Sequence, residues 1–282
     1  MGESGCGKTT LGRLLLRLER PDAGQITFDG QDWLATRGER LRVARKDIQA
    51  IFQDPLGSLD PRRTVGYAIG EALRAHRLAP GQDGREQRTA ELLAQVGLAP
   101  EVAGRHPGEL SGGQRQWVTI ARAIALQPKF VVCDEATSAL DVSVQAQIIN
   151  LLIDLQESLG VSYLFISHSL AAVRHVADRV GVMYLGRIVE EAPASRIFTV
   201  PQHPYTSALL AAAPVPDPAV ARKDLHARHL GGEVPSATHL PSGCRFRLRC
   251  PRAEAICAAQ GPPLAELAEL ADGHAVACHF PG

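Results

Sequence analysis

A glycine-rich stretch at the start of the chain places the strongest constraint on what it can fold into. Residues 2–9 read Gly-Glu-Ser-Gly-Cys-Gly-Lys-Thr, which matches the pattern G-x-x-x-x-G-K-[ST]. In this pattern the glycines let successive backbone N–H groups turn inward around phosphates, and the lysine brings its charge to the β- and γ-phosphate oxygens. The hydroxyl of Thr9 can bind Mg²⁺, and the helix that should begin there points its positive end at the anion. The stretch predicts a nucleoside triphosphate site.

A second motif, about a hundred residues downstream, narrows the kind of phosphate-binding protein. Leu110 is followed by Ser111, Gly112, Gly113 and Gln114. Serine before a helix is a good N-cap, and two glycines leave the first N–H groups of the helix accessible. We therefore predict a helix over residues 114–125 whose beginning is itself an anion site.

Polar residues follow three predicted strands. Residues 130–135 form an apolar run that ends in Asp134 and Glu135, which is typical of a buried parallel strand with carboxylates at its carboxyl end. A strand over residues 161–166 is followed by His168, and a strand over residues 48–52 delivers Gln53. We expect these side chains to gather at one edge of the sheet.

The remaining pattern predicts helices and turns around this sheet. Periodicity and turn residues indicate a helix over residues 10–18, a strand over 25–28, helices over 64–98 with a turn at 80–84, a helix over 143–159 that Gly160 ends, and a hairpin over 180–190 with Gly186 in its turn.

Taken together, these motifs resemble those of the ATP-binding subunit of ABC transporters. The resemblance implies an α/β fold over residues 1–200, a P-loop nucleotide-binding domain with a mostly parallel sheet flanked by helices and a helical subdomain at about residues 54–127. The family also carries antiparallel strands and an adenine-stacking aromatic residue before the phosphate loop, whereas only Met1 precedes Gly2 here. We therefore expect the sequence to be a fragment or its start codon to have been placed too late. The alternative is a product that does not bind ATP properly.

The resemblance also implies roles for individual residues. Glu135 would orient and deprotonate the attacking water, His168 would contact the γ-phosphate, and the loop of residues 138–141 would cross an interface with a second subunit. Two positions depart from the family pattern, because Trp117 stands where arginine is usual and Ser169 where aspartate is usual. The expected nucleotide contacts are Gly2, Gly5, Cys6, Gly7, Lys8, Thr9 and Thr10, the Mg²⁺ ligands are Thr9, Gln53 and Asp134, and Ser111, Gly112, Gly113 and Gln114 would contact the ATP held by the second subunit.

Beyond residue 200 the composition shifts to proline, alanine and histidine, which marks a second region over residues 201–282. Residues 203–206, 213–218, 232–236, 243–246 and 249–251 resemble the tail of oligopeptide and dipeptide importer ATPases. This region also contains Cys244, Cys250, Cys257 and Cys278, whose spacing lacks the C-x2-C pair of common zinc sites. Related importer ATPases imply a [4Fe–4S] cluster, whose negative charge nearby arginines would offset. Zinc, two disulfides and four unligated thiols are the alternatives.

Charge and hydropathy bound the function. Thirty basic residues balance thirty acidic ones, so there is no net field to recruit nucleic acid or an anionic membrane. No apolar run reaches the length of a membrane-spanning helix, and the first residues are not an export signal, which favours a cytoplasmic protein. The resemblance to transporter ATPases implies that it is held peripherally on the inner face of the cell membrane.

We thus expect an ATPase that energises import of dipeptides or oligopeptides. Its expected partners are a second ABC ATPase subunit, identical or a sister, two membrane permease subunits and, indirectly, an external solute-binding protein, with no nucleic acid. The alternatives are an importer ATPase for nickel, glutathione or another small solute, and a soluble ABC ATPase that acts on nucleic acid.

Overall fold

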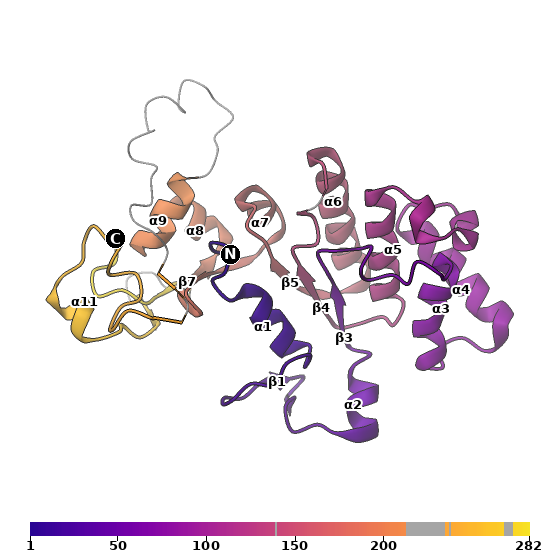
Figure 1. Cartoon of the computed structure of the whole chain (residues 1–282), viewed down its shortest axis with the longest axis horizontal. Helices are drawn as coiled ribbons and strands as arrows, with labels where there is room; N and C mark the ends of the chain where they lie inside the picture. Colours follow the sequence, from indigo (N-terminus) through magenta and orange to yellow (C-terminus); the bar gives the residue numbers. More distant parts are fainter. Residues whose placement is uncertain (139, 213–234, 237, 268–272) are drawn as a thin grey trace. The chain divides into compact units, whose positions relative to one another are not determined.

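The computed structural model describes residues 1–138, 140–212, 235–236, 238–267 and 273–282. These residues form two compact units, one of residues 9–166 and one of residues 1–8 and 167–282 (Figure 1). Residue 139 of the predicted interface loop, and the tail segments 213–218 and 232–234, lie outside the described residues. The boundary at residue 200 and the limits of the helical subdomain stay predictions.

The unit of residues 9–166 is built on a parallel sheet. Its strands are β3 (Ile48–Ile51), β4 (Phe130–Asp134) and β5 (Ser162–Ile166), in the order β3-β4-β5. Residue 130 pairs with residue 48 on one side and residue 162 on the other, and the apolar residues 131–133 of β4 are fully buried. The apolar run therefore forms the central strand, and the predicted parallel arrangement is confirmed.

Helices pack closely against this sheet. They are α1 (Lys8–Leu15), α5 (Gly112–Ile124) and α6 (Val142–Leu159) (Figure 1). A Cβ atom at Gly12 of α1 would lie 3.2 Å from side-chain atoms of Val132 and Ile166, so a glycine there lets α1 approach β4 and β5. Gly160 ends α6 in the left-handed conformation, with φ of 65°, as predicted.

A helical segment lies between β3 and α5 in the chain. It contains α3 (Val65–Ala75), α4 (Gly81–Gln95) and two short 3₁₀ segments, η1 (Pro100–Gly104) and η2 (Pro107–Glu109). Ile69, Leu73, Leu92 and Leu93 are at most 1% exposed and belong to the same apolar core as α5 and β4. The predicted helices are confirmed, except that α4 begins inside the expected turn.

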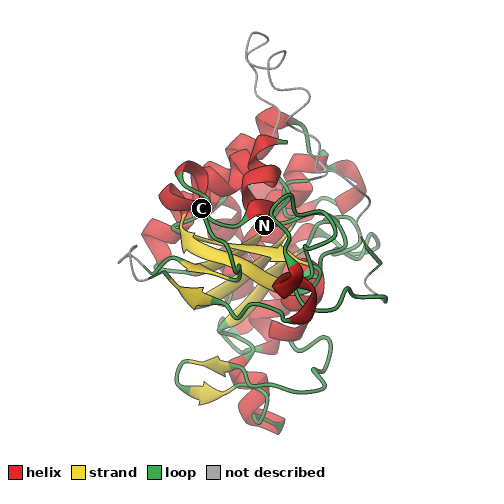
Figure 2. Ribbon diagram, turned by 90° about the vertical axis from the view of Figure 1, so that its left-hand side faces the viewer, coloured by secondary structure: helices red, strands yellow, loops and turns green. Residues whose placement is uncertain are grey.

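A small hairpin and one helix precede β3. The hairpin strands are β1 (Thr27–Phe28) and β2 (Gln31–Asp32), which Figure 2 shows as a short pair, and the helix is α2 (Gly38–Ala44). The predicted strand over residues 25–28 forms only at its last two residues, and α2 was not predicted.

The second unit is built on an antiparallel sheet. Its strands are β6 (Arg179–Tyr184), β7 (Arg187–Pro193), β8 (Ala265–Glu266) and β9 (Ala275–Val276), in the order β6-β7-β9-β8. The predicted hairpin is confirmed, and β9 of the C-terminal region extends its sheet by pairing with β7. The helices are α7 (Leu170–Val176), α8 (Ala194–Thr199), α9 (Pro204–Ala211) and α11 (Ala255–Ala259). None of the helices in the described ranges is long and apolar enough to span a bilayer.

Candidate nucleotide site

The phosphate loop of residues 2–8 is folded around its own lysine. Lys8 is 8% exposed, and its Nζ donates to the backbone oxygens of Gly2 at 2.8 Å and Glu3 at 2.9 Å. Gly5 and Gly7 have φ of 77° and 104°, a region that side chains other than glycine rarely adopt. The chain thus curls around the ammonium group before entering α1.

Close packing fixes one side of the loop and leaves the other open. A Cβ at Gly2 would lie 2.2 Å from the backbone oxygen of Met183 on β6, so only glycine fits there. The amide of Gly186, in the β6–β7 turn, donates to the oxygen of Cys6 at 2.7 Å. Ser4 and Gly5 are exposed, and a Cβ at Gly5 would meet no atom within 4 Å. One side of the loop is therefore packed, and the other is open to solvent.

The other unit brings a hydroxyl and a carboxylate together. Thr9 Oγ1 donates to Oδ1 of Asp134 at 3.2 Å, and Asp134 is 8% exposed at the end of β4. Hydroxyl and carboxylate oxygens are ligands that Mg²⁺ accepts in nucleotide sites. Thr10, in the first turn of α1, is exposed. Two of the three predicted magnesium ligands are therefore neighbours.

Glu135 occupies an uncommon backbone conformation. Its φ is 49°, in the left-handed region, which costs an ordinary residue about 1 kcal/mol or more. Its amide donates to the oxygen of Ile166 on β5 at 2.9 Å, and its own oxygen accepts from the amide and hydroxyl of Ser138. These bonds hold the half-buried Glu135 side chain at the carboxyl edge of the parallel sheet.

Gln53 and His168 also follow strands. Gln53 is exposed two residues beyond β3, and His168 is exposed two residues beyond β5. Ser169, which stands where the family usually has aspartate, is the N-cap of α7. Its hydroxyl accepts a hydrogen bond from the amide of Ala172. Aspartate is an equally good N-cap, so the substitution conserves this function.

Ser111 is the N-cap of α5 as predicted, although the helix begins at Gly112, two residues before the predicted start. Ser111 Oγ accepts from the amide of Gln114 at 3.2 Å, and Gln114 Oε1 accepts from the amide of Ser111 at 3.0 Å, which completes a capping box. A Cβ at Gly113 would lie 2.8 Å from Cγ1 of Val144 on α6. Trp117, the other departure from the family pattern, is half-buried and packs against the apolar core.

The predicted interface loop ends in a helix cap as well. Asp141 Oδ1 accepts from the amide of Val144 at 2.9 Å and from the hydroxyl of Ser143 at 2.6 Å. These hydrogen bonds hold the pKa of the exposed Asp141 carboxyl below its usual value.

The four C-terminal cysteines are free thiols in one neighbourhood. Burial raises the pKa of Cys244, Cys250 and Cys278, and interactions among the four thiols raise it further. Within the parts of the chain that the structure describes, no three or more histidine, cysteine or acidic side chains are placed to hold a metal ion.

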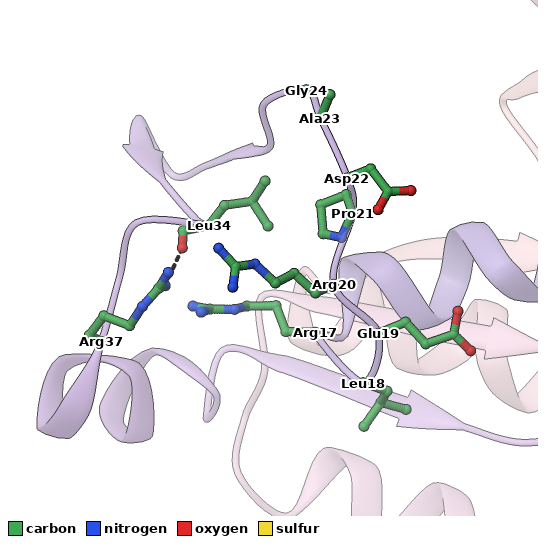
Figure 3. A pocket seen from close by; sticks show the side chains of 10 residues that line it. All are labelled: Arg17, Leu18, Glu19, Arg20, Pro21, Asp22, Ala23, Gly24, Leu34 and Arg37. Carbon is green, nitrogen blue, oxygen red and sulfur yellow. Dashed lines mark hydrogen bonds between the residues drawn. The ribbon is translucent and has the colours of Figure 1, made fainter.

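A pocket on the unit of residues 9–166 is rich in arginine. Figure 3 shows Arg17, Arg20 and Arg37 around it. Arg17 donates to the backbone oxygens of Trp33 and Thr36, and Arg37 donates to that of Leu34. Two of the three guanidinium groups are thus engaged with the backbone.

Sequence reasoning missed two residues that contact the phosphate loop. Tyr205 Oη accepts from the amide of Glu3 at 2.9 Å, and Arg249 forms two hydrogen bonds with the Glu3 carboxylate, at 2.9 and 3.1 Å. Both residues are more than 200 positions away from Glu3, and nothing local in the sequence pairs them. The one available signal was the acidic residue in a loop predicted to bind phosphates.

Comparison with known proteins agrees with this site. Residues 1–138 match the family described as "ABC transporter", and residues 189–257 match "Oligopeptide/dipeptide transporter, C-terminal region". The chain is 52% identical to the "Probable peptide ABC transporter ATP-binding protein y4tS" of Sinorhizobium fredii, over 99% of this chain and 77% of that protein. It is 49% identical to the "Oligopeptide transport ATP-binding protein AppF" of Bacillus subtilis, over 99% of this chain and 84% of that protein.

Solved structures show the same fold. The ATP-binding cassette MJ0796, in a dimeric post-hydrolysis state with ADP and Pi, is 29% identical with a TM-score of 0.61 and covers 69% of this chain and 83% of its own. The structure of cbiO1 from Clostridium perfringens, part of the cbiONQ transporter complex, is 27% identical with a TM-score of 0.63 and covers 71% of this chain and 78% of its own. The predicted α/β fold of an ABC nucleotide-binding domain is confirmed. The chain belongs to the family of ABC transporter ATP-binding proteins, as a member with the oligopeptide/dipeptide C-terminal region, and it is an ATPase that uses ATP and Mg²⁺.

Proposed function

We propose that this chain hydrolyses ATP to drive a membrane permease that imports dipeptides or oligopeptides. Relatives about half identical over nearly the whole chain are named for peptide transport, which supports this solute class. The chain would work on the inner face of the membrane with two permease subunits and a second ATPase subunit. An external solute-binding protein would act on the permease and not on this chain.

The contact between Thr9 and Asp134 carries the proposal. Their oxygens are 3.2 Å apart, one directly after the phosphate loop and the other at the end of the central strand. Such a pair would hold a magnesium ion, and Lys8 would bring its charge to the phosphates. Mg²⁺, when bound, would offset the charge that develops on the phosphate oxygens.

Glu135 would act on water. Its carboxylate would orient one water molecule and take up its proton as the water oxygen bonds to the γ-phosphorus and the bond to the bridging oxygen breaks. The hydrogen bond from the Glu135 amide to the backbone oxygen of Ile166, together with the left-handed backbone, would hold the carboxylate at the sheet edge. Gln53 would complete the water and metal contacts, and His168 would donate to a γ-phosphate oxygen.

The signature motif would serve a different nucleotide. Ser111 caps the start of α5, and helix N-termini favour anions. We infer that Ser111, Gly112, Gly113 and Gln114 contact the ATP held by a second ATPase subunit, with the loop at Asp141 beside them. The dimeric state of the related cassette MJ0796 supports this arrangement.

The decisive experiment replaces one carboxylate. We expect Glu135→Gln to reduce ATP turnover at least a hundredfold while ATP still binds, because the amide cannot take up the proton. Phosphate release and binding of a fluorescent ATP analogue measure the two effects. The matched control is Glu157→Gln, an exposed position on α6, which should leave both unchanged. Normal hydrolysis by Glu135→Gln would refute the assignment of Glu135.

Transport itself needs a separate test. In vesicles that contain the permease subunits and both ATPase subunits, peptide uptake should require ATP and should stop with Glu135→Gln. Uptake of nickel or glutathione, with no uptake of peptides, would instead favour the alternative solutes.

The four cysteines carry a further proposal, a [4Fe–4S] cluster. Their proximity supports it, but the thiols as placed are not arranged to hold a metal, so the fit is incomplete and no step of hydrolysis passes through a cluster. Iron and acid-labile sulfide in anaerobically purified protein would establish it. Zinc without sulfide, or neither, would exclude it.

A further inference from the structure

Glu3, the second residue of the phosphate loop, has every polar group engaged. Its amide donates to Tyr205 Oη at 2.9 Å, and its backbone oxygen accepts from Lys8 Nζ at 2.9 Å. Its carboxylate accepts from Nη1 and Nη2 of Arg249 at 2.9 and 3.1 Å. Two of these partners, Tyr205 and Arg249, lie in the C-terminal region. The C-terminal region therefore contacts Glu3, the residue whose backbone oxygen also accepts a hydrogen bond from Lys8.

Arg249 is held firmly in place for this contact. Its side chain is 3% exposed, and its guanidinium carbon lies 5.9 Å from the ring centre of Tyr184 and 6.0 Å from that of Phe246. Tyr184, Tyr205 and Phe246 are at most 2% exposed and pack on one another, with ring centres 4.7–5.4 Å apart. A two-pronged arginine on such a support loses little freedom when it binds a carboxylate.

A second arginine supports the far side of the loop. Arg245 Nη1 donates to the backbone oxygen of Leu185 in the β6–β7 turn. The next residue of that turn, Gly186, donates its amide to the oxygen of Cys6. The backbone from Glu3 to Cys6 is thus fixed at both ends, once directly by the C-terminal region and once through the turn.

The charge of Glu3 explains why such a support matters. A phosphate loop attracts a strongly negative ligand, and an uncompensated carboxylate within the loop would repel it. The two hydrogen bonds from Arg249 neutralise the charge of that carboxylate, and the Glu3 side chain is 22% exposed. Without Arg249 the loop would carry a bare negative charge beside the phosphates.

We propose that Arg249 and Tyr205 are positioning residues for nucleotide binding, through which the C-terminal region sets the charge and shape of the phosphate loop. This inference rests on the proposed ATP site. It gives the C-terminal region a direct part in ATP affinity, beyond any cofactor its cysteines hold.

The experiment is a two-residue cycle on the full chain, with binding of a fluorescent ATP analogue measured in low and in high salt. Arg249→Gln should weaken binding of the ATP analogue about tenfold in low salt, because the Glu3 carboxylate then repels the phosphates. The loss should be smaller in high salt, because salt screens this repulsion. Adding Glu3→Gln to that variant should restore most of the affinity, since the repelling charge is gone. A merely structural role for Arg249 would give neither the salt dependence nor the rescue.

Control variants separate the possible causes. Arg252→Gln, an exposed arginine of the same segment, should bind as the unmodified chain does. Tyr205→Phe keeps the buried ring and removes only the hydroxyl, so it should also weaken binding, and it tests the inference even where Arg249→Gln does not fold. Thermal unfolding of each variant reports its folded fraction.

Two results would overturn the inference. One is unchanged affinity in folded Arg249→Gln or Tyr205→Phe, and the other is a double variant that binds no better than Arg249→Gln alone. Lys8→Met distinguishes these from failure of the proposed function. If Lys8→Met abolishes binding while the Arg249 and Tyr205 variants bind normally, the ATP site stands and only their positioning role fails.

Discussion

The two glycines of the signature motif differ in what surrounds them. A Cβ at Gly112 would lie 3.4 Å from Cδ2 of Leu140, which is an ordinary contact. The same atom at Gly113 would lie 2.8 Å from Cγ1 of Val144, and valine is too stiff at χ1 to move aside easily. Gly113 is therefore a packing requirement between α5 and α6 as well as an expected nucleotide contact.

Substitution of these glycines should separate the two effects. We expect Gly113→Ala to lower the free energy of unfolding by about 1–2 kcal/mol, as overpacked positions do. Adding Val144→Ala should remove the clash and recover part of that loss. Gly112→Ala is the matched control and should be neutral or slightly stabilising, because alanine favours the helix. Urea denaturation checks all three, and equal stability of the two glycine variants would contradict the packing argument.

Single residues were predictable where the motif dictates their chemistry. The loop lysine, the pair Thr9 and Asp134, and Ser111 as a cap follow from residue type and spacing. The partners of Glu3 did not follow, because an ion pair between residues 3 and 249 leaves no local trace in the sequence. Which thiols approach one another in the C-terminal region was likewise hidden, since spacing does not fix connectivity.

Among the elements, α5 and α6 show how strongly local sequence sets helix ends. α5 begins at the capping box of Ser111 and Gln114, and α6 runs from the cap at Asp141 to the left-handed Gly160. The apolar run of residues 130–133 likewise identified β4 as a buried parallel strand. The two-residue strands β8 and β9 carry no such signal, because pairing and not propensity makes them strands: β9 pairs with β7 of the hairpin, and β8 pairs with β9.

The α5 cap gives a prediction at this scale. We expect Ser111→Ala to lower the free energy of unfolding by about 1 kcal/mol, because the amide of Gln114 loses its acceptor. Ser111→Asp keeps a capping oxygen and should stay within about 0.5 kcal/mol of the unmodified chain. Chemical denaturation of the two variants decides the matter. An unchanged free energy of unfolding in Ser111→Ala would show that the serine hydroxyl does not stabilise the helix.

At the scale of the whole molecule, a buried carboxylate joins distant parts of the chain. Glu190 on β7 is fully buried, and its oxygens accept from the amides of Gln202 and His203 at 2.7 and 3.0 Å. Its Oε1 also lies 2.7 Å from Nε2 of the buried His274, next to β9. Residues 190, 203 and 274 are thereby connected inside one unit.

This network makes acid stability a testable property. Burial lowers the pKa of His203 from 6.5 to about 4, although Glu190 and a bond to the Ala277 backbone oppose the shift. Below about pH 6.5 His203 binds a proton in the unfolded chain, whereas in the folded chain it stays neutral down to about pH 4. The free energy of unfolding therefore falls by roughly 3 kcal/mol as the pH drops through this window.

A variant isolates the contribution of His203. Its Nδ1 accepts from the amide of Tyr205 at 3.0 Å, and asparagine can supply an oxygen for the same cap. We expect His203→Asn to lose less stability than the unmodified chain between pH 6.5 and pH 4, as measured by denaturation at each pH. Identical pH profiles for the two proteins would show that another group governs the acid transition.

The contact between Glu3 and Arg249 has a consequence for anyone who builds chimeras from these ATPases. If the C-terminal region were joined to a nucleotide-binding domain with a neutral residue in place of Glu3, the Arg249 guanidinium, whose side chain is 3% exposed, would lose its carboxylate partner. Losing one partner of such a pair typically costs about 3–5 kcal/mol. The first and last segments of the chain should therefore be exchanged together, as a matched set.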